Sequence, residues 1–332
     1  MTDIRLSLDE VMDLALRALR ASGADEVNAA PVARNIWRAE RDGAKSHGLF
    51  RLPGYCGGLK SGKANGRARP RILSEEGSVI RLDADEAYYP VAHAVGLPAL
   101  AALAKRQGLA ALACRRGFHL AALWPEVETL CDAGLAAMAF TSTPPFVHNI
   151  GGTRKVFGTN PMAFGWPRPG RPPMIFDQAA SVTARGEVQL ALRDGRLAPE
   201  GAGIGPDGEP TRDPQAILDG AQSPFGGHKG AALALMVDLL AGPLIGEVTS
   251  LETGRQGDGK LPALGGQLIL AFAPERLGGA GALDHGERLF AELMEDPGVR
   301  LPGDRRAAMR PLTPETGVTI PEALHKEILS LC

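Results

Sequence analysis

The hydrophobic positions at the start of the chain recur at helical spacing. The segment Ser7–Glu10 has the form of a capping box, with serine at the N-cap and glutamate three residues later. A helix is therefore predicted from there to Gly23, and a second one from Glu26 to Arg41. The apolar face of the first helix consists of Val11, Leu14, Ala15 and Leu19. These two clear periods predict a helical amino-terminal lobe.

Short apolar runs and helical patterns are interspersed through the rest of the chain. Strands are expected within 71–82 and over 108–114, 135–141, 174–177 and 268–273. Helices are expected over 88–105, 124–131 and 229–240. The region from 52 to 70 is rich in glycine and basic residues, and 203–213 is expected to be a polar surface loop. The succession predicts an α/β fold with a mixed sheet.

Composition places the chain among ordinary globular proteins. It has 332 residues, of which 44% are apolar and 22% are charged, enough for about two domains. The net charge of −2 argues against nucleic acid or an anionic membrane as a main partner. The most apolar stretch, Ala231 to Leu240, is too short to span a bilayer.

The four cysteines show neither metal-type spacing nor an accompanying histidine cluster, so reduced thiols and no metal are expected. The first residues lack the pattern of a signal peptide, and we expect a cytoplasmic location.

The usual signatures of nucleotide-binding and hydrolytic enzymes are missing. The one G-x-G-x-x-G match runs from Gly203 to Gly208, where Pro-Asp-Gly forms a turn without a preceding strand. No P-loop, zincin or nucleophile-elbow motif occurs in the sequence. A nucleotide site in this chain must therefore be built in another way.

The segment from Ser46 to Pro53, S-H-G-L-F-R-L-P, is the first one dense in reactive side chains. His47 is suited to proton transfer near neutral pH, and Arg51 can present a planar fork to a carboxylate. From the residues alone, a histidine at a helix end beside a solvated arginine is the simpler interpretation. An acid–base and carboxylate site is the alternative.

Four other segments allow similar pairs of interpretations. His119 lies between a strand and a helix, either as a core histidine or beside backbone N–H groups that face a phosphate. Gly158 to Pro161 forms a turn, and Asp177 ends a strand, where it could contact a ribose. Gly226 to Gly230 is either a phosphate site with Lys229 or a flexible helix start.

Read in order, these segments resemble one family. They read S-H-G-x-x-R-x-P, H-x-A-A-L-W, G-T-N-P, F-D-Q-A and G-G-H-K-G, starting at residues 46, 119, 158, 176 and 226. The chain resembles the malate/L-lactate dehydrogenase type 2 family of NAD(P)-dependent oxidoreductases, in collinear order over nearly its whole length. Within that family, the wording from His119 to Glu126 and from Phe157 to Pro167 is closest to the Δ1-piperideine-2-carboxylate/Δ1-pyrroline-2-carboxylate reductases.

The resemblance implies a non-Rossmann α/β fold with a mixed, largely antiparallel sheet in the cofactor domain. It implies a helical substrate and dimerisation lobe, residues 1–75, packed with 251–332, and an NAD(P)-binding domain, residues 76–250. A homodimer acting on a small molecule is expected. The activity implied is NADPH-dependent reduction of a cyclic imine carboxylate to L-proline or L-pipecolate, with NADH as the alternative cofactor. A dehydrogenase of a linear 2-hydroxy acid and a catalytically silent binding protein are the rival interpretations.

The resemblance also implies roles for individual residues. His47 is the expected proton donor, Ser46 and Glu187 are its partners, and Arg51 and Thr159 bind substrate. The implied cofactor contacts are His119, Leu120, Ala121, Ala122, Leu123, Asp177, Gln178, Ala179, His228, Lys229, Gly303, Asp304 and Arg305. One departure precedes His119, where Arg115 and Arg116 replace the family's usual Asn-Ser-His type of run; they would favour the 2′-phosphate of NADPH.

Overall fold

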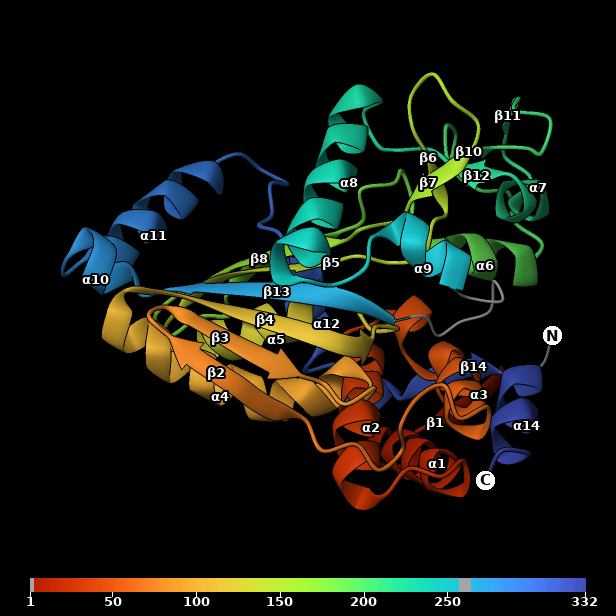
Figure 1. Cartoon of the computed structure of the whole chain (residues 1–332), viewed down its shortest axis with the longest axis horizontal. Coiled ribbons are helices and arrows are strands. Elements are labelled where there is room, and N and C mark those ends of the chain that lie inside the picture. Colours follow the sequence, from red (N-terminus) through yellow and green to blue (C-terminus); the bar gives the residue numbers. More distant parts are fainter. Residues whose placement is uncertain (1–2, 257–263) are drawn as a thin grey trace.

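The centre of the molecule is a seven-stranded sheet (Figure 1). The structure is a computed structural model that describes residues 3–256 and 264–332. All neighbouring strands of this sheet are antiparallel except β3 and β4, which are parallel. In spatial order the strands are β2 (Arg71–Glu76), β3 (Val79–Asp83), β4 (Leu109–Phe118), β13 (Leu264–Phe272), β5 (Ala136–Thr141), β8 (Met162–Trp166) and β9 (Met174–Gln178). A mixed α/β fold with a mostly antiparallel sheet, as expected from the sequence, is confirmed.

Helices cover this sheet on both faces. Helices α4 (Tyr89–Gln107) and α5 (Trp124–Asp132) pack on one face, and α8 (His228–Ala241) packs on the other (Figure 1). The parallel pair β3–β4 needs a crossover connection, and α4 provides it. The segment His228–Ile245 is long and apolar enough to cross a membrane by length and composition alone. Val237 of this segment is buried with Phe140 of β5, whereas Leu235, Met236 and Leu239 are exposed.

The amino-terminal helices form a second packed region together with the end of the chain. Helices α1 (Leu8–Ala21) and α2 (Glu26–Arg41) confirm the two predictions, including the capping box of Ser7 and Glu10. Strand β1 (Asp3–Leu6) pairs with β14 (Val318–Pro321), and α14 (Glu322–Leu329) follows. Buried side chains of α1, α2 and α14 share one hydrophobic cluster.

A smaller sheet of five short strands lies beside the large one (Figure 1). In spatial order its strands are β11 (Pro210–Thr211), β10 (Gly203–Ile204), β12 (Ala221–Gln222), β6 (Val147–His148) and β7 (Lys155–Phe157). The prediction of a surface loop over 203–213 was wrong in part, because β10 and β11 pair there as a hairpin. Gly203 is buried between Ala221 and Ile217 where a side chain would collide, so the sequence looks like a loop although it pairs.

One helix in the glycine-rich region escaped prediction. Helix α3 (Leu52–Lys60) begins with Pro53 in its first turn, where a missing N–H costs nothing. Its buried side chains Leu52, Tyr55 and Cys56 supply an apolar face that three glycines obscure in the sequence.

The remaining helices are short or lie at the periphery. They are η1 (Lys45–His47), η2 (Leu49–Arg51), α6 (Arg185–Arg193), α7 (Pro214–Asp219), η3 (Pro243–Ile245), α9 (Ser250–Gln256), α10 (Pro274–Gly278), α11 (Ala282–Leu293), α12 (Asp304–Met309) and α13 (Thr313–Thr316). Helices α10 and α11 extend away from the sheet as an arm (Figure 1).

Candidate active site

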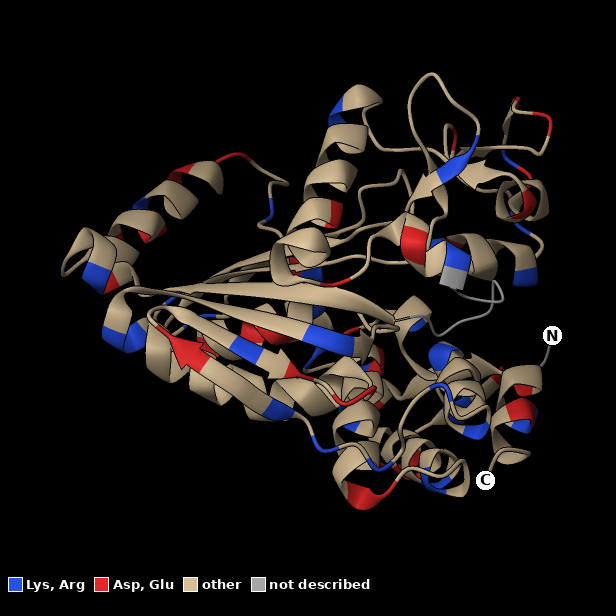
Figure 2. Cartoon of the chain, in the orientation of Figure 1, with Lys and Arg blue, Asp and Glu red and all other residues tan. Residues whose placement is uncertain are grey.

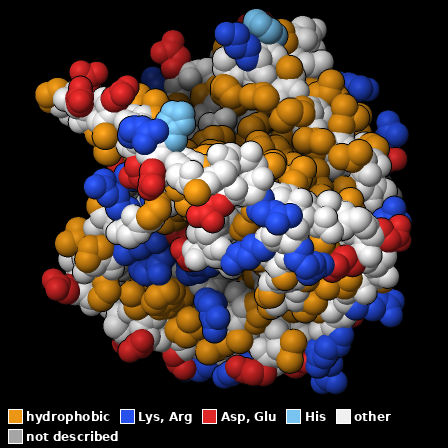
Figure 3. Space-filling model, turned by 90° about the vertical axis from the view of Figure 1, so that its left-hand side faces the viewer, with side chains coloured by type: hydrophobic (Ala, Val, Ile, Leu, Met, Phe, Trp, Pro, Cys, Tyr) orange, Lys and Arg blue, Asp and Glu red, His pale blue; other side chains and the backbone are white. Residues whose placement is uncertain are grey.

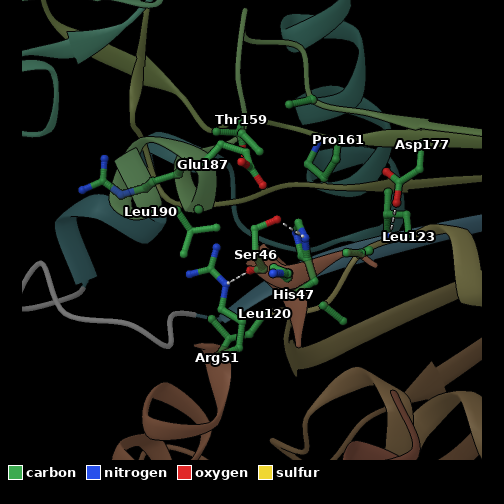
Figure 4. Close-up of a pocket in the computed structure, with 18 of the residues that line it drawn as sticks. Ser46, His47, Arg51, Leu120, Leu123, Thr159, Pro161, Asp177, Glu187 and Leu190 are labelled. Atoms are coloured by element: carbon green, nitrogen blue, oxygen red, sulfur yellow. Dashed lines mark hydrogen bonds between the residues drawn. The ribbon is translucent and has the colours of Figure 1, made fainter. Parts of the chain in front are cut away.

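A pocket of about 620 Å³ lies where separate segments of the chain meet. The turn after α2, the loop between β4 and α5, the end of β9 and the start of α6 all contribute to its wall (Figure 4). Ligand pockets usually have volumes of about 300–1,000 Å³. The pocket brings together Ser46, His47, Arg51, Thr159, Glu187, His119, Leu120, Ala121, Ala122, Leu123, Asp177, Gln178, Ala179 and Arg305.

Two short 3₁₀ turns, η1 and η2, shape the segment that holds His47 and Arg51. Between them, Gly48 lies so close to Glu40 that a Cβ would overlap the Glu40 carboxyl group. That carboxyl group accepts a hydrogen bond from the backbone N–H of Leu49 at 2.7 Å. Burial raises the pKa of Glu40 to about 7. The glycine of the S-H-G motif is therefore required by a close approach to α2.

The half-buried imidazole of His47 lies beside the hydroxyl group of the buried Ser46. Ser46 is 5% exposed, and its Oγ lies 3.0 Å from Nδ1 of His47 (Figure 4). Burial lowers the pKa of His47 to about 3, and the charge of Arg51 adds to the effect. When the hydroxyl group donates to Nδ1, the ring proton sits on Nε2. This pair can hold and orient one proton.

Arg51 is held in place rather than solvated. Its Nε donates to the backbone oxygen of Ser46 at 2.8 Å, and its Nη1 donates to Oε1 of Gln189 at 3.1 Å. Burial lowers the pKa of its guanidinium group. The interpretation of a solvated arginine at a helix end was therefore wrong. Sequence reasoning missed Gln189, which lies on α6, one turn after Arg185. That position on the helix is the one feature of the sequence that could have pointed to it.

Glu187 lies on the first turn of α6, with its carboxylate turned toward Ser46 and His47 (Figure 4). Its negative charge raises the pKa of Arg51, in opposition to burial. Thr159 lies close by, and its hydroxyl group is 3.4 Å from that of Thr143. Both side chains line the pocket.

The turn that contains Thr159 is shaped by its neighbour. Asn160 is fully buried with a positive φ of 35°. Its Oδ1 accepts the N–H of Thr143 at 3.1 Å, and its Nδ2 donates to the backbone oxygen of Ala234 at 2.9 Å. The amide of Asn160 is thus occupied within the protein, and Thr159 is the polar residue of G-T-N-P that reaches the pocket.

The Asp177 side chain caps the amino-terminal end of α5. Its Oδ2 accepts the N–H groups of Leu123 at 2.8 Å and Trp124 at 3.0 Å. Burial raises the pKa of this carboxyl group, while these two bonds favour its charged form. The backbone N–H groups expected to face a phosphate are therefore already bonded at these two residues.

His119 lies deeper in the same wall. Among the described residues, neither of its buried ring nitrogens has a hydrogen-bond partner. Burial lowers its pKa to about 3. The His119 side chain is half-buried and lines the pocket, so its ring is accessible to a ligand.

A second pocket of about 350 Å³ adjoins the first and shares Asp177, Arg305 and Arg306 with it. Gly303 lines this second pocket, whereas Asp304 accepts the N–H of Leu301 at 2.8 Å and lines neither. Arg306, which sequence reasoning missed, donates to the backbone oxygen of Ile175 at 2.8 Å.

Four basic residues singled out from the sequence do not line either pocket: Arg115, Arg116, His228 and Lys229. Arg116 forms ion pairs with Asp83 at 3.0 Å and Glu86 at 3.1 Å, which occupies its charge. Its suggested contact with a 2′-phosphate stays a prediction. His228 and Lys229 begin α8, on the face of the large sheet opposite to α4 and α5 (Figures 1 and 2).

Within 3–256 and 264–332, no group of three His, Cys, Asp or Glu side chains is arranged to hold a metal ion. The pocket instead combines a half-buried imidazole with an immobilised guanidinium group, and a second pocket adjoins it. Such a set suits proton transfer to a bound carboxylate compound.

The chain belongs to the malate/L-lactate dehydrogenase family of NAD(P)-dependent oxidoreductases, which matches residues 6–329. It is 47% identical to a Δ1-pyrroline-2-carboxylate/Δ1-piperideine-2-carboxylate reductase of Pseudomonas aeruginosa, over 99% of both chains. It is 46% identical to a Δ1-pyrroline-2-carboxylate reductase of Ancylobacter novellus, over 99% of this chain and 97% of the relative. The Δ1-piperideine-2-carboxylate reductase structure from Pseudomonas syringae pvar. tomato superposes with a TM-score of 0.93 at 38% identity, covering 99% of this chain and 100% of that one.

Proposed function

We propose that this chain reduces Δ1-pyrroline-2-carboxylate or Δ1-piperideine-2-carboxylate to L-proline or L-pipecolate with NADPH. The observation that carries the proposal is the hydrogen-bonded Ser46–His47 pair beside an immobilised Arg51 in one pocket. One group handles a proton and the other a carboxylate, as an imine carboxylate requires. The names of the similar reductases support the same substrate class.

Arg51 binds the substrate carboxylate and fixes the ring in the pocket. His47 then lies where it can donate a proton to the ring nitrogen. An anion close to an imidazole favours its charged form, so the bound carboxylate raises the pKa of His47 from its depressed value. Ser46 orients the ring through Nδ1, Glu187 favours the charged imidazole, and Thr159 contacts the substrate.

We infer that the two adjoining pockets, of about 620 and 350 Å³, together hold a nicotinamide dinucleotide. The unpartnered ring of His119 and the cations Arg305 and Arg306 offer polar partners along its length. When bound, the cofactor supplies a hydride to C2 of the imine. We assign its binding to residues 119–123, 177–179 and 303–305, and we propose NADPH because Arg305 and Arg306 line both pockets. The cytoplasm, where NADPH is available, is the expected compartment.

We further propose a homodimer formed through the face that carries α8. Leu235, Met236 and Leu239 are exposed on α8, and Leu289 and Leu293 are exposed on the arm. Hydrophobic side chains gather in the hollow on this side of the molecule (Figure 3), and α8 carries few charges (Figure 2). A second copy covering this face would make Lys229 and His228 available to the partner's cofactor. This explains how residues outside the pocket can belong to it.

The proposed domain organisation assigns substrate and cofactor to different parts of the chain. We propose that residues 1–75 with 251–332 form the substrate and dimerisation lobe, and that residues 76–250 bind the cofactor by a non-Rossmann arrangement. Arg51 and His47 come from the first part, and Asp177 and His119 come from the second.

A substrate panel tests the proposal. The purified protein would be assayed for oxidation of NADPH and NADH with Δ1-pyrroline-2-carboxylate, Δ1-piperideine-2-carboxylate, pyruvate and oxaloacetate. We expect a cyclic imine with NADPH to give the highest kcat/KM. A higher kcat/KM for a linear 2-keto acid would favour the dehydrogenase of 2-hydroxy acids. No binding of either cofactor would favour a silent binding protein.

A further inference from the structure

The side chain of Arg310 joins three segments that are far apart in the sequence. Arg310 directly follows α12, and its Nε and Nη2 donate to the two carboxylate oxygens of Asp42 at 3.0 and 2.8 Å. Its Nη2 also donates to Oε1 of Glu128 on α5. The side chain of Asp42, directly after α2, is fully buried, and that of Glu128 is 5% exposed. Arg310 therefore connects the end of α2, α5 and α12.

Each of the connected segments carries residues of the candidate site. Asp42 lines the first pocket, shortly before the turn that holds the acid–base pair. Glu128 lies one turn after Trp124, which lines the same pocket. Helix α12 carries Arg306, which lines both pockets. Arg310 itself lines neither pocket, so it can influence the site only through these neighbours.

The ring of Trp124 provides a second attachment of α12 to the wall of the pocket. The Cζ atoms of Arg306 and Arg310 lie 5.5 and 6.0 Å from the centroid of this ring. Cations over an indole face are attracted by the electrons of the ring. The two arginines are one helical turn apart, so they present one face of α12 to Trp124. The position of Arg306 in the pocket therefore depends on how α12 is held.

The two carboxylates that Arg310 contacts each have a second arginine partner. Arg41 pairs with Asp42 at 2.7 Å, and Arg38 pairs with Glu128 at 2.6 Å. Burial disfavours the charged form of Arg310, but the two carboxylates outweigh burial and raise its pKa. Removal of Arg310 leaves neither carboxylate unpaired, and an unpaired buried charge is the strongly destabilising case. The specific contribution of Arg310 is therefore the connection between segments, rather than neutralisation of charge.

We propose that Arg310 is a positioning residue, which couples binding of the cofactor to binding of the substrate. This inference rests on the proposed function, because residues 303–305 at the start of α12 are assigned there to the cofactor. With Arg310 in place, a cofactor that contacts α12 also fixes Asp42 and the substrate-binding turn that follows it. Coupling of this kind appears as tighter binding of one ligand in the presence of the other. It also serves the reaction, since a small misplacement of reacting groups lowers the rate.

The test measures this coupling directly. The Kd of pyrrole-2-carboxylate, an aromatic analogue of the cyclic imine, would be measured by calorimetry with the full-length protein, without cofactor and with saturating NADPH. The ratio of the two Kd values is the coupling, and we expect about 5-fold or more in the wild type, as is usual for coupled sites. In Arg310→Gln the ratio should fall below about 2-fold, while the Kd measured without cofactor changes by less than about 3-fold.

Arg41→Gln is the matched control. Like Arg310→Gln, it leaves Asp42 with a single arginine partner, but it keeps the connection from Asp42 to α12. The coupling in Arg41→Gln should therefore stay within about 2-fold of the wild-type value. An equal loss of coupling in both variants would show that only the charge balance of Asp42 matters, and it would overturn the inference.

The remaining outcomes separate the inference from the proposed function. An unchanged ratio in a folded Arg310→Gln protein, or binding without any coupling in the wild type, would overturn the role of Arg310 and leave the proposed function intact. Failure of the wild type to bind either ligand would overturn the proposed function instead. If Arg310→Gln does not fold, Arg310→Lys keeps the charge but loses the planar fork that spans both carboxylates. It should also lower the ratio, and an unchanged ratio in this variant would contradict the inference.

Discussion

Replacement of Arg51 by lysine removes the planar fork but keeps the positive charge. The wild-type guanidinium group is fixed by its bonds to Ser46 at 2.8 Å and Gln189 at 3.1 Å, and the Arg51 side chain lines the pocket. An ammonium group on a flexible stem makes neither of these bonds in the same geometry. Loss of one charge-assisted hydrogen bond to the substrate costs about 1.5–3 kcal/mol, which corresponds to about 10- to 150-fold in binding.

Steady-state kinetics with Δ1-pyrroline-2-carboxylate measures this effect. We expect Arg51→Lys to raise KM by that factor and to lower kcat much less, because the carboxylate contact is present both before and during the reaction. Arg17→Lys on the exposed face of α1 is the matched control, and it should leave both constants unchanged. A folded Arg51→Lys protein with unchanged KM would refute the assignment of Arg51 to the carboxylate.

Three further predictions concern His47 and the partner subunit. His47→Ala should lower kcat by about 10²- to 10⁴-fold, and a near-normal kcat would remove the imidazole from the mechanism. Because His47 has a pKa of about 3 in the folded protein and about 6.5 when unfolded, only the unfolded chain takes up its proton between these values. Stability against urea should therefore fall as the pH decreases below about 6.5, and the decrease should be shallower in His47→Asn; equal slopes would contradict the depressed pKa. Mixed dimers of His47→Ala with Lys229→Ala should recover activity, since one of their two sites combines an intact His47 with the intact lysine of the other subunit. Activity no higher than that of the Lys229→Ala protein alone would show that Lys229 acts within its own subunit.

Much of the local structure follows from the sequence. The helices of the amino-terminal region were predicted because capping residues and a 3.6-residue period agree there, as in α1 and α2. The hairpin of β10 and β11 and the helix α3 were missed because glycine and proline normally indicate loops. In both cases tertiary contacts, the close approach at Gly203 and the buried face of α3, overrule the local pattern.

The site could be predicted only as far as its chemistry lies in short motifs. Ser46, His47 and Arg51 occur within six residues, so their spacing already suggests acid–base and carboxylate chemistry. Gln189 and Arg185 come from a helix more than a hundred residues away, and nothing near them in the sequence indicates that they meet Arg51. Asp177 was expected to contact a ribose, and its bonds to Leu123 and Trp124 reveal a further use that only the folded chain can show.

The most direct test of the central claim follows the hydride itself. The protein would be incubated with Δ1-pyrroline-2-carboxylate and NADPH deuterated at the transferable position of the nicotinamide, and the product would be examined by chiral chromatography and mass spectrometry. We predict L-proline that carries one deuterium at C2. Unlabelled or absent proline, together with deuterium transfer to pyruvate or oxaloacetate when these are supplied instead, would contradict the account.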